Sequence, residues 1–253
     1  MKNKEVSIIM AAFNAERTIE DSVRSVLTQT FTNWELIVVD DFSSDKTAEI
    51  VKNIARDDSR IRLYNNKQNC GIAGTRNIAM SHAQGGWLAF LDSDDIWHPT
   101  KLEKQLRFAS ETNAQITFTA TSYINEVGQP YNYVLNVPVK FVYKQLLRKN
   151  LMSCSSVMVK RDVMVNFPQG FMHEDYVVWL QILRKLGCAY GLDQPLLIYR
   201  LYKGSTSGNR LKSAKMIYGS YRKVEYGRFK AMLLTLCYSV HSIIKRKRIK
   251  AGR

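Results

Sequence analysis

Three carboxylates occupy four successive positions of the sequence, at Asp92, Asp94 and Asp95. They follow residues 87–91, an apolar run without alternation that predicts a short strand buried on both faces. Like charges at this spacing repel one another, so the cluster favours a cation among them, and carboxylate oxygens suit Mg²⁺ or Mn²⁺. Because ligands of open α/β sheets bind beyond the carboxyl ends of strands, the cluster is a candidate site for metal and phosphate. Taken alone, a solvated turn that caps the next helix explains it equally well.

Two further segments place polar side chains at the end of a strand or the start of a helix. Asp40 and Asp41 follow the apolar run 35–39, where a carboxylate accepts hydrogen bonds either from a nucleotide or from neighbouring backbone N–H groups. Residues 69–77 (NCGIAGTRN) form a glycine-containing loop that leads into a helix. Its backbone and Arg76 favour phosphate, although an ordinary turn with a solvated Arg76 fits the same letters.

A last acidic pair, Glu174 and Asp175, begins an apolar helical pattern after a loop that contains Gly170. Acids in the first turn of a helix are ordinary partners of the helix dipole. A carboxylate in this position is also able to take a proton from a hydroxyl nucleophile, as a general base does. Both interpretations fit the sequence of this segment.

These segments sit in an alternating pattern of strands and helices. We expect four short strands, at 6–12, 35–39, 61–64 and 87–91. They alternate with helical patterns at 15–30, 46–55, 73–82 and 99–110. Such alternation predicts βαβ units and a mostly parallel, doubly wound sheet, with both acidic clusters at the same edge. Beyond residue 115 the patterns are weaker. They suggest strands at 116–124, 134–141, 154–160 and 192–200, with helices at 141–151 and 176–186.

The charge of the chain is concentrated in its last segment. Of the formal net charge of +15, residues 209–253 carry +12, because they hold thirteen Lys and Arg against the single acid Glu225. Charge placed in this way suits an anionic surface, either membrane lipid or nucleic acid. Residues 231–244 are apolar on one helical face and have basic residues at both ends, which is typical of a helix that lies in a membrane interface. A helix packed on its own domain is the alternative.

The location of the protein is also constrained by what the sequence contains. The four cysteines, Cys70, Cys154, Cys188 and Cys237, show no metal-finger or CxxC spacing and are expected to be reduced thiols of a cytosolic protein. We find no signal-peptide pattern and no apolar stretch of about 20 residues that would span a bilayer. We therefore expect a soluble or peripheral protein.

Five motifs, in order, resemble those of the inverting family 2 glycosyltransferases with the GT-A fold. They are an opening strand with FNA, then QTFTNWELIVVDDFSSDKT, NCGIAGTRNIA, FLDSDD and MHEDY, across about residues 5–200. The resemblance implies an α/β GT-A fold with a Rossmann-like doubly wound, mostly parallel sheet and a C-terminal basic amphipathic helical tail. It divides the chain into a glycosyltransferase domain at 1–208, with a nucleotide-sugar half at 1–112 and an acceptor half at 113–208, and a basic membrane-associating tail at 209–253.

The resemblance also assigns roles to residues on the donor side. Asp41 matches the family's uracil-contacting aspartate, and Arg76 its basic residue near the nucleotide. Asp92 and Asp94 match the DxD pair, with Asp94 as the direct metal ligand and Asp92 nearer the ribose, while Asp95 is a secondary candidate for either role. The segment Ala11-Ala12-Phe13 departs from the family, where many members have Pro or a hydroxyl residue and then Tyr.

On the acceptor side the resemblance points to four residues. Asp175 matches the catalytic base, and Glu174 lies beside it at the acceptor site. Arg200 and Lys203 stand where some members place basic residues toward a diphosphate.

The function implied is transfer of a hexose, glucose or galactose, from a UDP-sugar to a polyprenyl-diphosphate-linked sugar, with a β-linkage and with Mn²⁺ or Mg²⁺ as cofactor. The chain is similar to bacterial enzymes of O-antigen and capsule synthesis, which implies a cytoplasmic protein peripheral to the inner face of the cell membrane, bound to anionic lipid through residues 228–253. A catalytically silent sugar-nucleotide-binding module is one alternative. A nucleic-acid-binding protein is the other, but the basic excess avoids the βαβ segment and no nucleic-acid motif is found.

Overall fold

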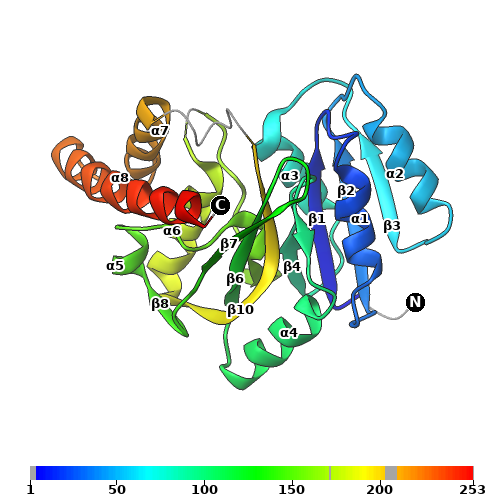
Figure 1. Cartoon of the computed structure of the whole chain (residues 1–253), viewed down its shortest axis with the longest axis horizontal. Helices are drawn as coiled ribbons and strands as arrows, with labels where there is room; N and C mark the ends of the chain where they lie inside the picture. Colours follow the sequence, from blue (N-terminus) through cyan, green and yellow to red (C-terminus); the bar gives the residue numbers. More distant parts are fainter. Residues whose placement is uncertain (1–3, 171, 203–209, 253) are drawn as a thin grey trace.

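A single ten-stranded sheet runs through the computed structural model, which describes residues 4–170, 172–202 and 210–252 (Figure 1). Its strands follow the order β3-β2-β1-β4-β9-β6-β10-β5, with β7 beside β6 and β8 beside β10. The first four strands are β1 (Val6–Ala12), β2 (Trp34–Asp40), β3 (Ile61–Asn65) and β4 (Trp87–Phe90). Neighbours among these four are parallel, as the alternating sequence pattern predicts.

Four helices cover both faces of this parallel half: α1 (Ile19–Leu27), α2 (Thr47–Ala55), α3 (Gly71–Ser81) and α4 (Lys101–Glu111). Every residue of β2 is buried, and its side chains alternate between two cores. Leu36 and Val38 pack on the side of α1, α2 and α4, whereas Ile37 and Val39 pack on the side of α3. The doubly wound sheet is therefore confirmed, and it follows from strands that are apolar on both faces.

The second half of the sheet is mixed. Its strands are β5 (Ile96–Trp97), β6 (Ile116–Asn125), β7 (Pro130–Leu135), β8 (Lys140–Val142), β9 (Met158–Lys160) and β10 (Cys188–Leu201). β6 and β10 are parallel, and β9 joins the two halves by pairing antiparallel with β4 and β6. The helix α6 (Glu174–Leu186) covers this half, and Trp179 packs edge-on against Phe90 of β4.

Three sequence expectations in this half are confirmed only in part. The strand expected at 134–141 is split between β7 and β8, because Pro138 has no N–H to donate to a ladder. The helix expected at 141–151 is the single turn α5 (Tyr143–Leu146), because the chain up to Val142 pairs with β10. The strand expected at 154–160 begins as a 3₁₀ turn, Cys154–Ser156, in which both the backbone N–H and the hydroxyl of Ser156 donate to the carbonyl of Ser153.

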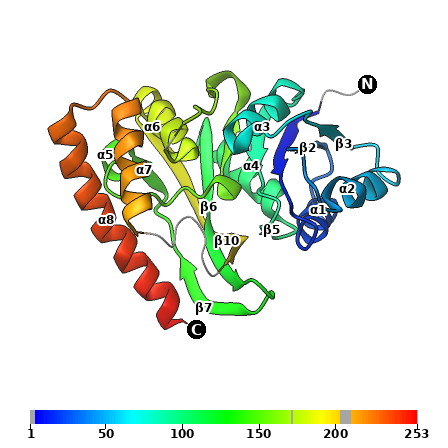
Figure 2. The same cartoon turned by 90° about the horizontal axis from the view of Figure 1, so that it is seen from above.

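Two helices, α7 (Arg210–Lys223) and α8 (Arg228–Ala251), form a hairpin beside α6, at the opposite end of the molecule from α1 and α2 (Figures 1 and 2). The hairpin is part of the main core, since Ile217, Tyr221 and Ala231 are buried there. The other face of α8 is exposed. Among the described residues no helix combines the length and apolar character needed to cross a membrane. All four cysteines are free, as expected.

Candidate active site

The acidic cluster lies where β4 ends, in the middle of the sheet. The chain leaves the strand at Leu91, whose N–H still donates to Ile9 of β1, and then turns so that the N–H of Asp95 donates to the carbonyl of Asp92. Two hydroxyls hold this turn. Ser155 accepts a hydrogen bond from the N–H of Asp92 at 3.0 Å, and Thr18 donates one to the carbonyl of Ser93 at 3.0 Å.

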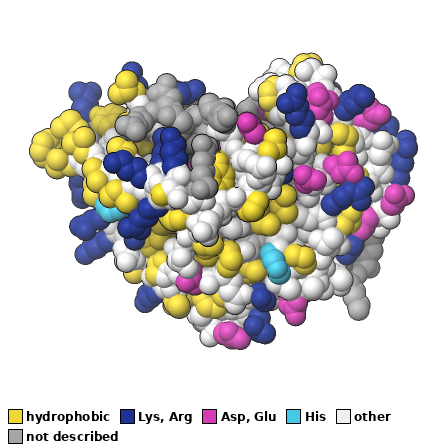
Figure 3. Space-filling view, in the orientation of Figure 1, with side chains coloured by type: hydrophobic (Ala, Val, Ile, Leu, Met, Phe, Trp, Pro, Cys, Tyr) yellow, Lys and Arg dark blue, Asp and Glu magenta, His cyan; other side chains and the backbone are white. Residues whose placement is uncertain are grey.

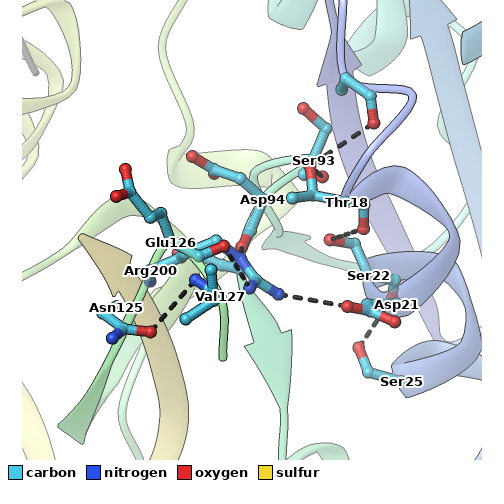
Figure 4. Close-up of polar contacts among 12 residues, drawn as sticks. Thr18, Asp21, Ser22, Ser25, Ser93, Asp94, Asn125, Glu126, Val127 and Arg200 are labelled. Atoms are coloured by element: carbon cyan, nitrogen blue, oxygen red, sulfur yellow. Dashed lines mark hydrogen bonds and ion pairs between the residues drawn. The ribbon is translucent and has the colours of Figure 1, made fainter. Parts of the chain in front are cut away.

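Arg200 of β10 fastens the same turn from the other side (Figure 4). Its Nε donates to the carbonyl oxygen of Asp94 at 3.0 Å, and one Nη donates to Asp21 Oδ2 of α1 at 3.2 Å. The Arg200 side chain is only 5% exposed. It therefore positions the acidic turn in this structure, and its expected role toward an acceptor diphosphate would require these contacts to be exchanged. Lys203, the other basic residue expected there, lies outside the described residues.

Two carboxylates of the turn are held in an environment that disfavours their charge. Burial, followed by the nearby Asp92, raises the pKa of Asp94 to about 6. Burial also raises the pKa of Asp95 well above its usual range, and Asp94 and Asp92 add to the effect. One oxygen of Asp95 accepts the N–H of Arg200 at 3.1 Å, whereas its Oδ2 is buried without a hydrogen-bond partner among the described residues. Carboxylates so placed would be stabilised by a cation.

Arg76 of α3 joins the acidic turn to the start of α6. Its guanidinium is almost fully buried and donates to Asp92 Oδ1 at 2.5 Å and to Glu174 Oε1 at 2.9 Å. Burial opposes the charge on Arg76, but the acidic groups around it, Asp92 first and then Cys154, Glu174 and Asp175, outweigh burial and raise its pKa. Three residues predicted as site residues are thus in direct contact, although they are 98 positions apart at the extremes. The structure places Arg76 as a clamp between the two acidic segments.

Replacement of Arg76 by methionine is expected to destabilise the protein by roughly 2–4 kcal/mol, because it leaves two partly buried carboxylates without their counter-charge. Urea denaturation measures this difference. The matched control is Arg24→Met, which removes an ion pair with Glu20 in which both side chains are more than half exposed, and which should change stability by less than about 1 kcal/mol. Equal losses in the two variants would show that the buried clamp does not contribute as described.

Asp175 sits beside this clamp, at the first turn of α6. Burial, reinforced by the neighbouring Glu174, raises its pKa to about 7, even though Arg76 and the N–H of Tyr176 lower it. The Tyr176 N–H donates to Asp175 Oδ1 at 2.7 Å and fixes the carboxylate. A carboxylate with a pKa near neutrality exchanges protons most effectively near pH 7. The site therefore combines Asp175, a carboxylate suited to act as a base, at the start of α6 with the carboxylates at the end of β4, which are of the kind that bind a metal.

Asp40 and Asp41 end β2, two strands from the acidic turn in sheet order. Asp41 Oδ1 accepts hydrogen bonds from Asn66 Nδ2 at 2.8 Å and from the N–H of Cys70 at 2.7 Å. This ties the end of β2 to the loop before α3. Gly71, the first residue of α3, takes a positive φ of 70° that favours glycine. Phe13 directly follows β1 and is 52% exposed, so its aromatic ring is accessible beside these strand ends.

The sequence analysis did not identify several residues that organise the site. Asn66 orients Asp41, Ser155 holds the N–H of Asp92, and Asp21 pairs with Arg200. Each acts through a contact between segments that are distant in the sequence, so no local pattern marks it. The serine run around Ser155 was the only available signal.

The residues at the turn fit a divalent cation. The donors are hard carboxylate oxygens, one of them a buried oxygen of Asp95 without a partner among the described residues, and Asp94 gains from a positive charge. No group of three or more His, Cys, Asp or Glu that would form a complete protein cage is found within residues 4–170, 172–202 and 210–252. That agrees with the usual binding of Mg²⁺ and similar ions through one or two carboxylates together with substrate phosphates.

Comparison with known proteins identifies the family. The model of glycosyl transferase family 2 matches residues 7–164, which is more than half of the chain. The chain belongs to this family, and it is a glycosyltransferase with the GT-A fold. The fold and family expected from the five motifs are therefore confirmed.

Relatives of known activity and structure agree with this assignment. The chain is 40% identical over 216 residues to WfgD of Escherichia coli, a UDP-Glc:alpha-D-GlcNAc-diphosphoundecaprenol beta-1,3-glucosyltransferase, covering 83% of this chain and 82% of WfgD. It superposes on S. aureus TarS 1-349 in complex with UDP-GlcNAc with a TM-score of 0.72 at 18% identity, covering 91% of this chain and 70% of TarS. For mannosyltransferase PcManGT from Pyrobaculum calidifontis, in complex with GDP-Man and Mn²⁺, the TM-score is 0.70 at 18% identity, covering 94% and 70%.

Proposed function

We propose that this glycosyltransferase moves a hexose, glucose or galactose, from a UDP-sugar to a sugar linked to a polyprenyl diphosphate, forming a β-linkage in the synthesis of a bacterial surface polysaccharide. The similarity to WfgD, whose name states a UDP-glucose donor and a diphosphoundecaprenol-linked acceptor, supports this substrate class. The observation that carries the proposal is the placement of Asp175, a carboxylate with a pKa of about 7, next to the Arg76 clamp that reaches the acidic turn.

In the proposed reaction Asp175 accepts the proton of the acceptor hydroxyl as its oxygen attacks the anomeric carbon of the donor. The bond from that carbon to the diphosphate breaks in the same step, so an α-linked donor gives a β-linked product. No covalent bond to the protein is needed, so one carboxylate base suffices. Glu174, held by Arg76, would then contact the acceptor from beside the base.

The donor would bind along the strand ends. Asp41, already oriented by Asn66 and Cys70, would accept a hydrogen bond from the uracil N–H, and Asp92 would lie near the ribose. Asp94 and Asp92 would hold a divalent metal, Mn²⁺ or Mg²⁺, with Asp95 as a secondary candidate ligand. When bound, the metal supplies positive charge to the departing diphosphate. The Mn²⁺ present with GDP-Man in the PcManGT structure supports this choice of cofactor.

The test of this function is a panel of UDP-, GDP- and dTDP-sugars offered with a lipid-diphosphate-linked GlcNAc or GalNAc acceptor, in the presence of Mn²⁺ or of EDTA. We expect one UDP-hexose to be transferred, and only with the metal. Nucleotide binding without transfer from any donor would support instead a silent sugar-nucleotide-binding module.

The raised pKa of Asp175 has a consequence for the pH profile. Below about pH 7 the carboxyl is protonated and unable to accept the acceptor's proton, so kcat/KM should rise with pH up to about 7 and level off above it. Glu174→Gln removes the neighbouring charge that raises this pKa, so the rising limb should move to lower pH. The measurement is kcat/KM at a series of pH values for both proteins. A profile that is flat from pH 5.5 to 8 would contradict the role of Asp175.

We further propose that α8 holds the enzyme at the anionic inner face of the cell membrane. Its exposed large apolar residues fall on one side of the helix, within about a third of its circumference: Phe229, Met232, Leu233, Leu236, Val240 and Ile244. Lys247, Arg248 and Lys250 are exposed near the C-terminal end of this apolar stripe. Figure 3 shows apolar side chains gathered at the outer end of the hairpin with basic side chains around them. An apolar stripe with basic neighbours suits an interface of anionic lipid.

The double substitution Leu236→Glu with Val240→Glu should weaken binding to phosphatidylglycerol-containing vesicles about tenfold or more, because it places two charges on the face that would enter the lipid. These side chains are 60% and 56% exposed, so the thermal unfolding midpoint should stay unchanged. The control is Val127→Glu with Val139→Glu, which adds equal charge at exposed positions outside α8. Vesicle cosedimentation is the measurement. Equal binding by both double variants would reject α8 as the membrane contact.

A further inference from the structure

A cavity opens between α7 and α8, outside the proposed donor site at the ends of β2 and β4. Its volume is about 40 Å³, and its lining combines three serine hydroxyls, the hydroxyl of Tyr238 and a guanidinium with apolar side chains: Ser213, Ala214 and Ile217 of α7, and Tyr238, Ser239, Ser242, Ile243 and Arg246 of α8. The hydroxyl of Ser239 donates to the carbonyl of Thr235, so Ser213 and Ser242 are the better candidates to donate into the cavity. Hydroxyl donors next to a guanidinium favour an anion with several oxygens, such as a phosphate or diphosphate.

The cavity lies close to the proposed base. The ring of Tyr238, on its wall, is 5.3 Å from the ring of Tyr176, the residue that follows Asp175. On the α7 side, Ser220 accepts the N–H of His173 at 3.2 Å, so the helix is bonded directly to the segment that carries the base. Arg246, on the cavity wall, also interacts electrostatically with His173, in the segment that carries the base. Burial lowers the pKa of His173, Glu174 opposes this, and Arg246 lowers it further.

The cavity also lies beside the apolar stripe of α8. At about 100° per residue, Ser239, Ser242 and Arg246 project from the flank of the helix next to the side that carries Leu236 and Val240. Ile243, on the cavity wall, stands between Ser242 and the exposed Ile244. Around its surface, α8 therefore carries first the apolar stripe, then the polar side chains that line the cavity, and then Tyr238, which packs near the base.

We propose that the cavity between α7 and α8 binds the diphosphate of the lipid-linked acceptor, with Arg246 as its cation and Ser213 and Ser242 as hydrogen-bond donors. This inference rests on the proposed function. The acceptor sugar then reaches Asp175 on one side of the diphosphate, and the lipid chain leaves along the apolar stripe on the other. The hairpin of α7 and α8 therefore selects acceptor sugars that carry a diphosphate and a lipid. The exposed face of α8 contacts the lipid of the same acceptor molecule whose sugar reacts at Asp175.

The test uses the full chain in detergent, with two acceptors that carry the same sugar and alkyl chain, one joined through a diphosphate and one a simple alkyl glycoside. Arg246→Gln should raise KM for the diphosphate acceptor about tenfold, the loss expected for one charged hydrogen bond. The KM for the UDP-sugar and the kcat should stay within about twofold, and KM for the alkyl glycoside should not change. Ser242→Ala should act in the same direction more weakly, and Arg246→Lys should restore part of the affinity.

Lys215→Gln is the matched control, because it removes one positive charge from the exposed surface of α7 without altering the cavity lining. It should leave both acceptors unaffected. Equal increases in KM for the two acceptors in Arg246→Gln, or none, would overturn the proposal.

Calorimetric titration of an alkyl diphosphate measures the subsite without any transfer. Binding that is weakened about tenfold in Arg246→Gln supports the subsite, and binding that is unchanged rejects it. If wild-type protein binds the probe in this way but transfers no sugar, the proposed function fails and the anion site stands. Transfer to the alkyl glycoside as efficient as transfer to the diphosphate acceptor would reject the subsite and keep the glycosyltransferase.

Discussion

Asp175→Asn is expected to reduce kcat for sugar transfer by about 10³-fold, within the range that general-base catalysis contributes, while Kd for the UDP-sugar stays within about twofold. Asparagine keeps the size of the side chain and its ability to accept the N–H of Tyr176, but it does not take up a proton. The amide also removes a negative charge next to Glu174, so folding should be unimpaired.

Steady-state kinetics together with calorimetric titration of the donor separate these two effects. Asp162→Asn, at an exposed acid outside the site, is the control and should behave as wild type. An Asp175→Asn enzyme with wild-type kcat would remove Asp175 from the role of base.

Asp94→Asn is expected to reduce turnover by about 10²- to 10³-fold, because the site loses a carboxylate that would hold the metal against the departing diphosphate. The same substitution should stabilise the metal-free protein. The pKa of Asp94 is raised from its usual 3.8 to about 6, so folding of the metal-free protein becomes less favourable as pH rises from about 4 to about 6, and the cost remains above that range. A neutral amide avoids this cost.

Thermal unfolding and transfer assays at pH 7.5, with and without Mn²⁺, test both halves of this prediction. Wild type should gain stability when Mn²⁺ and UDP are added, and Asp94→Asn should gain much less. If Asp94→Asn is less stable than wild type without metal, the Asp94 carboxylate is not electrostatically unfavourable in the metal-free protein. If the variant is as active as wild type with Mn²⁺, Asp94 is not the metal ligand.

The parallel half of the fold was predictable because its strands β1, β2 and β4 are mostly apolar runs bounded by polar or turn residues. β2 is the clearest case, with all seven residues buried and Asp40 at its end. The second half was not, because its elements depend on pairing between distant segments. β9 is only three residues long and exists through its pairing with β4 and β6, and the fate of residues 134–141 depends on one proline.

The site residues that stand at the ends of strands and helices could be predicted from the sequence, whereas the contacts between distant segments could not. The sequence places Asp92, Asp94 and Asp175 at strand or helix ends, but it does not show that Arg76 ties the acidic turn to the start of α6. The family resemblance assigns Arg200 to the acceptor side, but nothing in the sequence shows that its guanidinium also holds the acidic turn in place. Residues that act by positioning others are visible only once the fold brings them together.

The configuration of the product tests the central claim most directly. Wild-type enzyme would be incubated with the UDP-hexose that it accepts and a diphosphate-linked acceptor in the presence of Mn²⁺, and the new glycosidic linkage would be assigned by proton NMR. Single displacement with Asp175 as base predicts a β-linkage from an α-linked donor. An α-linked product would mean retention of configuration and would contradict the account.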